Sequence, residues 1–140
     1  MTQSDWRRFQ HAIDSNGVSD TLEREVYSKI YSAEGGEKSD GTTASGITTE
    51  ILTKIHSNGE QWQKDRLKAS GIKPGALPSL LSPEQRVAVY KLYIDSTVGP
   101  SKASNGKISG VDILDDRIGD NNTICAVADT LFREGGPTGT

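Results

Sequence analysis

One stretch decides the fold: SPEQRVAVYKLYI, residues 82–94. Ser82 is a favourable helix cap, Pro83 suits the first helical position, and Gln85 sits where the third residue of a capping box belongs. The apolar residues that follow spread over a broad face of a helix, which is typical of an element covered on several sides. We therefore expect this helix to be the central, most buried element of an all-α domain.

On both sides of this stretch, apolar residues recur at helical spacing and are followed by glycine or Asn-Gly stops. The expected helices span residues 4–16, 20–33, 48–58, 61–69, 111–118 and 122–133, the last capped by Asn122 or Thr123. Polar, glycine-rich or proline-containing segments at 35–45, 73–78 and 99–110 predict connections. No strand pattern is convincing, so the prediction is about six or seven helices with little or no sheet.

Composition narrows the class of protein. A chain of 140 residues with a hydrophobic fraction of 33% is predicted to form a single domain, 1–140. Its net charge is −3 and no basic stripe appears, which argues against nucleic acid. Cys125 is alone, and His11 and His56 have no partners at ligand spacing, so neither a metal nor another cofactor is expected.

The chain shows neither a signal-peptide pattern at its start nor an apolar run of membrane-spanning length. We therefore expect synthesis in the cytoplasm and no membrane insertion. Cys125 lies among Ile124, Ala126 and Val127, which predicts that it is a small, buried apolar residue. Trp62 has two interpretations, packing within its helix or stacking on a sugar ring, and its place in an amphipathic helix favours packing.

Glu34 is the main candidate for chemistry, because it stands where a helix ends at Gly35-Gly36. The C-terminal end of a helix is its negative end, so a carboxylate is disfavoured there. A general acid for glycoside cleavage must hold its proton near neutral pH, and the adjacent glycines would let a polymer approach the backbone. The alternative is a solvated helix-end glutamate followed by a glycine C-cap.

The sequence SAEGG at 32–36, then Asp40, then TASGIT at 43–48, resembles the opening signature of glycoside hydrolase family 108. These bacterial and phage N-acetylmuramidases are similar in architecture to lysozymes. The resemblance implies a lysozyme-like domain in which Glu34 is the catalytic acid and Asp40 the first candidate for a second carboxylate. By the same resemblance and by their placement, the expected substrate-binding residues are Gly35, Gly36, Thr43, Thr48, Tyr90 and Tyr93.

Weaker similarity continues through 80–85, the tyrosine-containing helix at 90–93 and the stretch from 128 to 137, so that it covers about 19–139. Three features depart from the family pattern. The loop at 40–43 is shorter, a helix precedes the motif, and the chain stops where a wall-binding region would follow. These departures concern the substrate cleft and wall anchoring more than the acid.

The resemblance thus implies a hydrolase that cleaves the bond between N-acetylmuramic acid and N-acetylglucosamine in peptidoglycan glycan strands, after release or secretion. An immunity or delivery protein is compatible with this route, and nothing in the sequence identifies one. The alternatives are a non-catalytic glycan-binding or phage/secretion structural module and a lytic transglycosylase. Asp40 equally fits a turn before Gly41, and Thr48 equally fits a helix cap.

Overall fold

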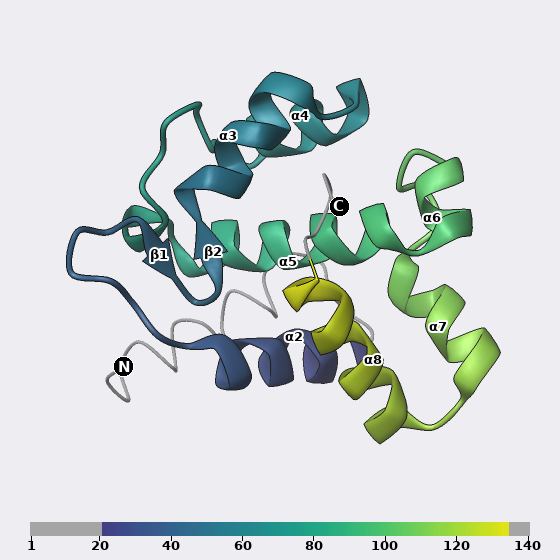
Figure 1. Cartoon of the computed structure of the whole chain (residues 1–140). Helices are drawn as coiled ribbons and strands as arrows, with labels where there is room; N and C mark the ends of the chain where they lie inside the picture. Colours follow the sequence, from purple (N-terminus) through teal and green to yellow (C-terminus); the bar gives the residue numbers. More distant parts are fainter. Residues whose placement is uncertain (1–20, 135–140) are drawn as a thin grey trace.

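The computed structural model describes residues 21–134, and it confirms an all-α domain for them (Figure 1). The predicted helix at 4–16 lies outside the described residues. A two-stranded sheet and one 3-10 turn accompany seven α-helices within 21–134. The elements are α2 Thr21–Glu34, β1 Thr43–Ala44, β2 Ile47–Thr48, α3 Thr49–Asn58, α4 Gln61–Ala69, η1 Pro78–Leu80, α5 Pro83–Thr97, α6 Gly99–Ala103, α7 Gly110–Ile118 and α8 Asn121–Arg133.

Helix α5 is the central element, as its sequence predicts. The Ser82 hydroxyl accepts from the backbone N–H of Gln85 at 3.2 Å, and the Gln85 side chain accepts from the backbone N–H of Ser82 at 2.8 Å, which completes the capping box. Figure 1 shows α5 running through the middle, with α3 and α4 on one side and α2 and α8 on the other. Its buried apolar residues face both groups because the apolar face is broad.

The segment 99–110 differs from the prediction of a loop, because it contains the short helix α6. Pro100 supplies a helical φ near the start, and the buried Ser101 hydroxyl donates to the Ile108 carbonyl at 2.5 Å. The Ser104 hydroxyl then accepts from the Ile108 backbone N–H at 3.0 Å. Tertiary hydrogen bonding to serine side chains thus stabilises a helix in a segment whose glycine and serine content predicts a loop.

The cap of α8 is also corrected. The helix begins at Asn121, and the carboxylate of Asp120 accepts from the backbone N–H of Thr123 at 2.9 Å and from its hydroxyl at 2.6 Å. These hydrogen bonds, that of the hydroxyl first, lower the pKa of Asp120. Asp120 is therefore the cap in place of Asn122 or Thr123, since a carboxylate one turn earlier meets the first free N–H groups.

A small β-hairpin follows α2 in the segment predicted as a loop. Its strands are antiparallel, with Thr43 opposite Thr48 and Ala44 opposite Ile47. Ser45 and Gly46 form the turn with φ of 54° and 79°, the positive angles that two-residue type I′ hairpins need. Two-residue strands are too short to produce a visible alternation in the sequence.

None of the helices within 21–134 has the length and apolar character needed to cross a bilayer.

Candidate active site

Glu34 is the last residue of α2, in agreement with the predicted helix end. Its side chain is 23% exposed, so it is accessible from one side and packed on the other. Gly35 follows so closely that a Cβ there would lie 3.1 Å from the carbonyl oxygen of Tyr31, whereas Gly36 has open space around it. The chain can leave the helix sharply because the first of these two residues has no side chain.

The turn of the hairpin packs against the stem of Glu34. A Cβ on Gly46 would lie 2.8 Å from the Cβ of Glu34 and 2.7 Å from Cε1 of Phe132. With φ of +79°, this position requires glycine for both backbone conformation and space. The hairpin turn therefore packs against the base of the Glu34 side chain and against Phe132 of α8.

Two side chains of α5 hold the hairpin turn itself. The fully buried Tyr90 hydroxyl donates to the Ser45 carbonyl at 2.6 Å, and burial raises the pKa of Tyr90 far above its ordinary value, so it remains a donor. The Arg86 guanidinium donates to the Ser45 hydroxyl at 2.9 Å and to the Glu37 carboxylate at 3.3 Å. The sequence did not single out Arg86, because its partners Glu37 and Ser45 lie more than 40 residues away along the chain.

A guanidinium and a second carboxylate stand next to Glu34. Arg133, at the end of α8, places Nε 3.7 Å from Oε1 of Glu34 and 3.2 Å from Oδ2 of Asp129. The Arg133 side chain is 58% exposed and the Asp129 side chain 19% exposed. Oδ1 of Asp129 is buried and has no hydrogen-bond partner among residues 21–134. Sequence reasoning missed both residues, because only the packing of α8 on α2 brings them to Glu34.

Asp40 occupies a different environment from Glu34. It is exposed, and its Oδ1 accepts from the backbone N–H of Thr42 at 3.0 Å and from the Thr42 hydroxyl at 2.7 Å. These two hydrogen bonds, that of the hydroxyl first, lower the pKa of Asp40. The carboxylate thus closes a turn before Gly41, which has φ of +81°. This is the geometry of the turn-forming interpretation.

The other expected substrate contacts have structural partners. Thr43 pairs with Thr48 across the hairpin, and the Thr48 hydroxyl accepts from the Ile51 backbone N–H at 3.2 Å as the cap of α3. Tyr93 is 4% exposed, and its ring centroid lies 4.6 Å from that of Phe132. Burial raises the pKa of Tyr93 as well. Tyr90 and Tyr93 therefore support the site from the core and do not present their rings at the surface.

The remaining candidates have ordinary structural roles. Trp62 donates from Nε1 to the Glu60 carboxylate at 2.7 Å, and the Arg66 guanidinium lies 5.3 Å above its ring. Cys125 is buried, and this burial raises the pKa of its thiol, which lowers its reactivity. Within the described part of the chain, no group of three or more His, Cys, Asp or Glu side chains is arranged to hold a metal ion.

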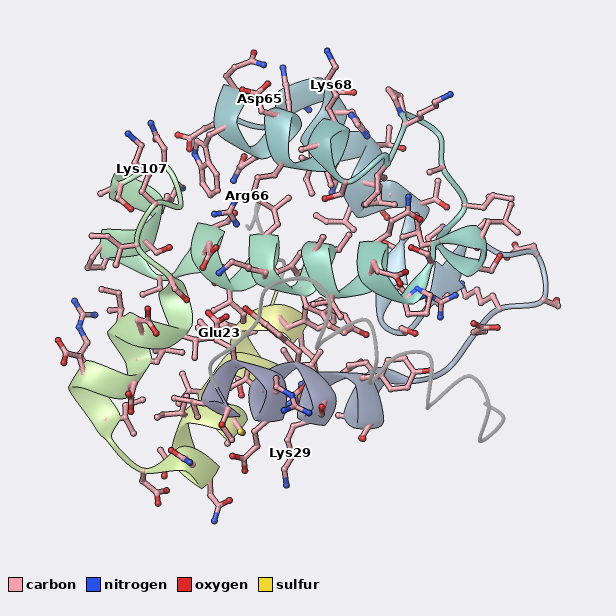
Figure 2. The ribbon with its side chains drawn as sticks, turned by 180° about the vertical axis from the view of Figure 1, so that it is seen from behind. Glu23, Lys29, Asp65, Arg66, Lys68 and Lys107 are labelled. Atoms are coloured by element: carbon pink, nitrogen blue, oxygen red, sulfur yellow. The ribbon has the colours of Figure 1, made fainter. Side chains whose placement is uncertain are left out.

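A second charged cluster lies along the other half of α5, and we call Glu23, Arg66, Lys91 and Asp95 the Asp95 network. Asp95 is fully buried and contacts Nη1 of Arg66 at 2.6 Å and the backbone N–H of Gly110 at 2.7 Å. Lys91 lies 3.5 Å from Asp95 and 3.4 Å from Glu23. Figure 2 shows Arg66 and Glu23 on opposite sides of α5. The network therefore ties α2, α4 and α7 to α5.

Comparisons of this chain with protein-family models, with curated proteins and with solved structures found no match. Assignment of a function therefore depends on the resemblance of the 32–48 motif and on the geometry around Glu34.

Proposed function

We propose that the protein is a peptidoglycan muramidase, which cleaves the bond between N-acetylmuramic acid and N-acetylglucosamine with Glu34 as general acid. One observation carries the proposal: the glutamate of the family-like motif ends α2, remains 23% exposed, and is held by the glycine turn of the hairpin. A general acid needs a fixed side chain that a substrate oxygen can reach.

In the proposed reaction, Glu34 donates its proton to the glycosidic oxygen while the bond from that oxygen to the anomeric carbon breaks. Positive charge develops on the sugar ring, and water then adds to the anomeric carbon. Arg133 places its Nε 3.7 Å from Oε1 of Glu34 and attracts this carboxylate. Arg133 is more than half exposed, so water screens its attraction, and the ion pair can open when a glycan binds.

The substrate of this reaction is a glycan strand of the cell wall, so the function requires release or secretion of the protein. Asp40, the second carboxylate that the resemblance offers, is engaged by Thr42 in its turn. The acid role is therefore assigned to Glu34 alone, and Asp40 remains the alternative second carboxylate.

The test is digestion of purified peptidoglycan by wild type and Glu34→Gln, with the products identified by mass spectrometry. A matched control is Glu50→Gln, because the Glu50 side chain is 77% exposed and pairs with Lys54 one turn along α3. We expect reducing muropeptides from wild type and from the control, and none from Glu34→Gln. Anhydro products would identify a lytic transglycosylase instead, and intact sacculi would indicate a non-catalytic module.

A further inference from the structure

The carboxylate of Asp129 shares a cation with Glu34. Both contact the same nitrogen, Nε of Arg133, so Oε1 of Glu34 and Oδ2 of Asp129 cannot be farther apart than 3.7 Å and 3.2 Å added together. In glycosidases whose second carboxylate activates the attacking water directly, the two carboxyl groups lie roughly 6.5–9.5 Å apart, and the upper limit here reaches the short end of that range. An Asp–Arg pair one turn apart is common on helix surfaces, but here the arginine also reaches the end of a second helix.

The second oxygen of Asp129 distinguishes it from a surface ion-pair partner. Oδ1 is buried, and no residue within 21–134 donates a hydrogen bond to it. A buried acceptor without a donor costs free energy, and such groups are retained where a water molecule, an ion or a reacting group completes them. The Asp129 side chain as a whole is 19% exposed, and a carboxylate with such access beside the proposed acid is suited to accept a proton from water.

We propose that Asp129 is the second carboxyl group of the site and activates the water that attacks the sugar, an inference that rests on the proposed muramidase function. Asp129 accepts one proton from this water, and the water oxygen bonds to the anomeric carbon. The bond from that carbon to the glycosidic oxygen breaks, and the oxygen takes the proton of Glu34. Solvent then returns a proton to Glu34 and removes one from Asp129, so that both groups are restored.

Arg133 has a positioning role in this scheme. It holds the two carboxylates close together when both are ionised, which would otherwise be opposed by their mutual repulsion. When Glu34 carries its proton, Arg133 retains Asp129 as a partner, since that contact is the shorter of the two. Asp129 is then the carboxylate and Glu34 the acid, as the reaction requires.

The test compares peptidoglycan digestion by wild type, Glu34→Gln, Asp129→Asn and Glu134→Gln. Glu134 directly follows Arg133 and is exposed, so its variant is the matched control. We expect Asp129→Asn to lower the initial rate by roughly 10²- to 10⁴-fold, the range for loss of a general base. Glu134→Gln should match wild type, and circular dichroism should show the same thermal midpoint for all four proteins.

A second variant separates a catalytic from a structural contribution. Sodium azide added to Asp129→Ala should restore cleavage and give a glycosyl azide, because azide attacks the anomeric carbon without needing a base. A merely structural contact would not respond to azide. A loss of rate that follows a fall in the thermal midpoint, with no azide product, would therefore refute the role of Asp129.

The outcomes also separate this inference from the proposed function. If Glu34→Gln is inactive and Asp129→Asn stays within a few-fold of wild type, Asp129 is not the second carboxyl group and the muramidase function stands. If wild type leaves the sacculi intact, both the function and the role of Asp129 are rejected.

Discussion

The molecule contains two charged clusters built from the same kinds of side chain, and they differ in how completely their groups are paired. In the Asp95 network, one carboxylate oxygen of the fully buried Asp95 contacts Arg66 and Lys91, and the other accepts from Gly110. In the cluster of Glu34, Asp129 and Arg133, which we call the Arg133 cluster, the cation is 58% exposed and one buried oxygen has no partner within 21–134.

This difference indicates different uses of charge. A buried, fully paired carboxylate fixes how helices pack, because removal of either partner leaves an uncompensated charge. A more than half-exposed cation such as Arg133 contributes little to stability through its ion pairs and remains accessible to a ligand. We therefore attribute a role in folding to the Asp95 network and propose a functional role for the Arg133 cluster.

Among the changes predicted here, alkaline pH should lower the folding stability most, because it acts on both regions together. Burial raises the pKa of Tyr27, beside the Asp95 network, and of Tyr90 and Tyr93, behind the Arg133 cluster. The unfolded tyrosines ionise near pH 10 whereas the folded ones keep their protons, so stability is complete below about pH 10 and is lost above it. Tyrosinate absorbance and helical circular dichroism should change in one transition. If the tyrosinate absorbance rose at a lower pH than that at which the helical signal is lost, this coupling between tyrosine ionisation and unfolding would be contradicted.

Asp95→Ala should cost about 3–5 kcal/mol of unfolding free energy, the usual consequence of leaving a buried cation without its partner. Urea denaturation followed by circular dichroism measures it. Glu50→Ala is the matched control, because it also removes one carboxylate from an ion pair, but an exposed one. A loss below about 1 kcal/mol for Asp95→Ala would remove the distinction between the two clusters.

Gly46→Ala should disturb the Arg133 cluster without removing any charge. The added methyl meets Glu34 and Phe132 at a positive φ, and overpacking of this kind costs about 1–3 kcal/mol. Because the methyl displaces the stem of Glu34, peptidoglycan cleavage should fall more than thermal stability does. Gly99→Ala is the control, since it has open space and no positive φ. Full activity of a folded Gly46→Ala would argue against a fixed Glu34.

Asp40→Asn should have the smallest effect. Asparagine keeps an oxygen that can accept from Thr42, so the turn should survive. The lowered pKa of Asp40 means that its carboxylate stabilises the turn above its ordinary pKa, and this contribution is lost as the pH falls. Cleavage should remain within a few-fold of wild type. A loss equal to that of Asp129→Asn would instead make Asp40 the second carboxylate.

Local signals account for what the sequence predicts well. The reciprocal hydrogen bonds of Ser82 and Gln85 start α5, Thr48 caps α3, and α4 spans the predicted 61–69. Each of these depends on residues within one turn of the helix end. Helix α6 was not predictable in the same way, because the partner of its Ser101 hydroxyl is a carbonyl in a later loop.

In the candidate site, too, local features could be predicted from the sequence, whereas contacts between helices could not. The position of Glu34 at a helix end follows from the glycines beside it, whereas its contact with Arg133 depends on how α8 packs against α2. The tyrosines of α5 show what the sequence could not predict. A broad apolar face predicts burial but not which residues also reach a cleft, and Tyr90 proves to be fully buried.

The role of Glu34 is tested by measuring the release of muropeptides from purified peptidoglycan by wild type and Glu34→Gln at equal concentration. We expect reducing muropeptides from wild type and none from a Glu34→Gln protein with an unchanged thermal midpoint. Equal release by both proteins, or intact sacculi with wild type, would contradict the assignment of Glu34 as the catalytic acid.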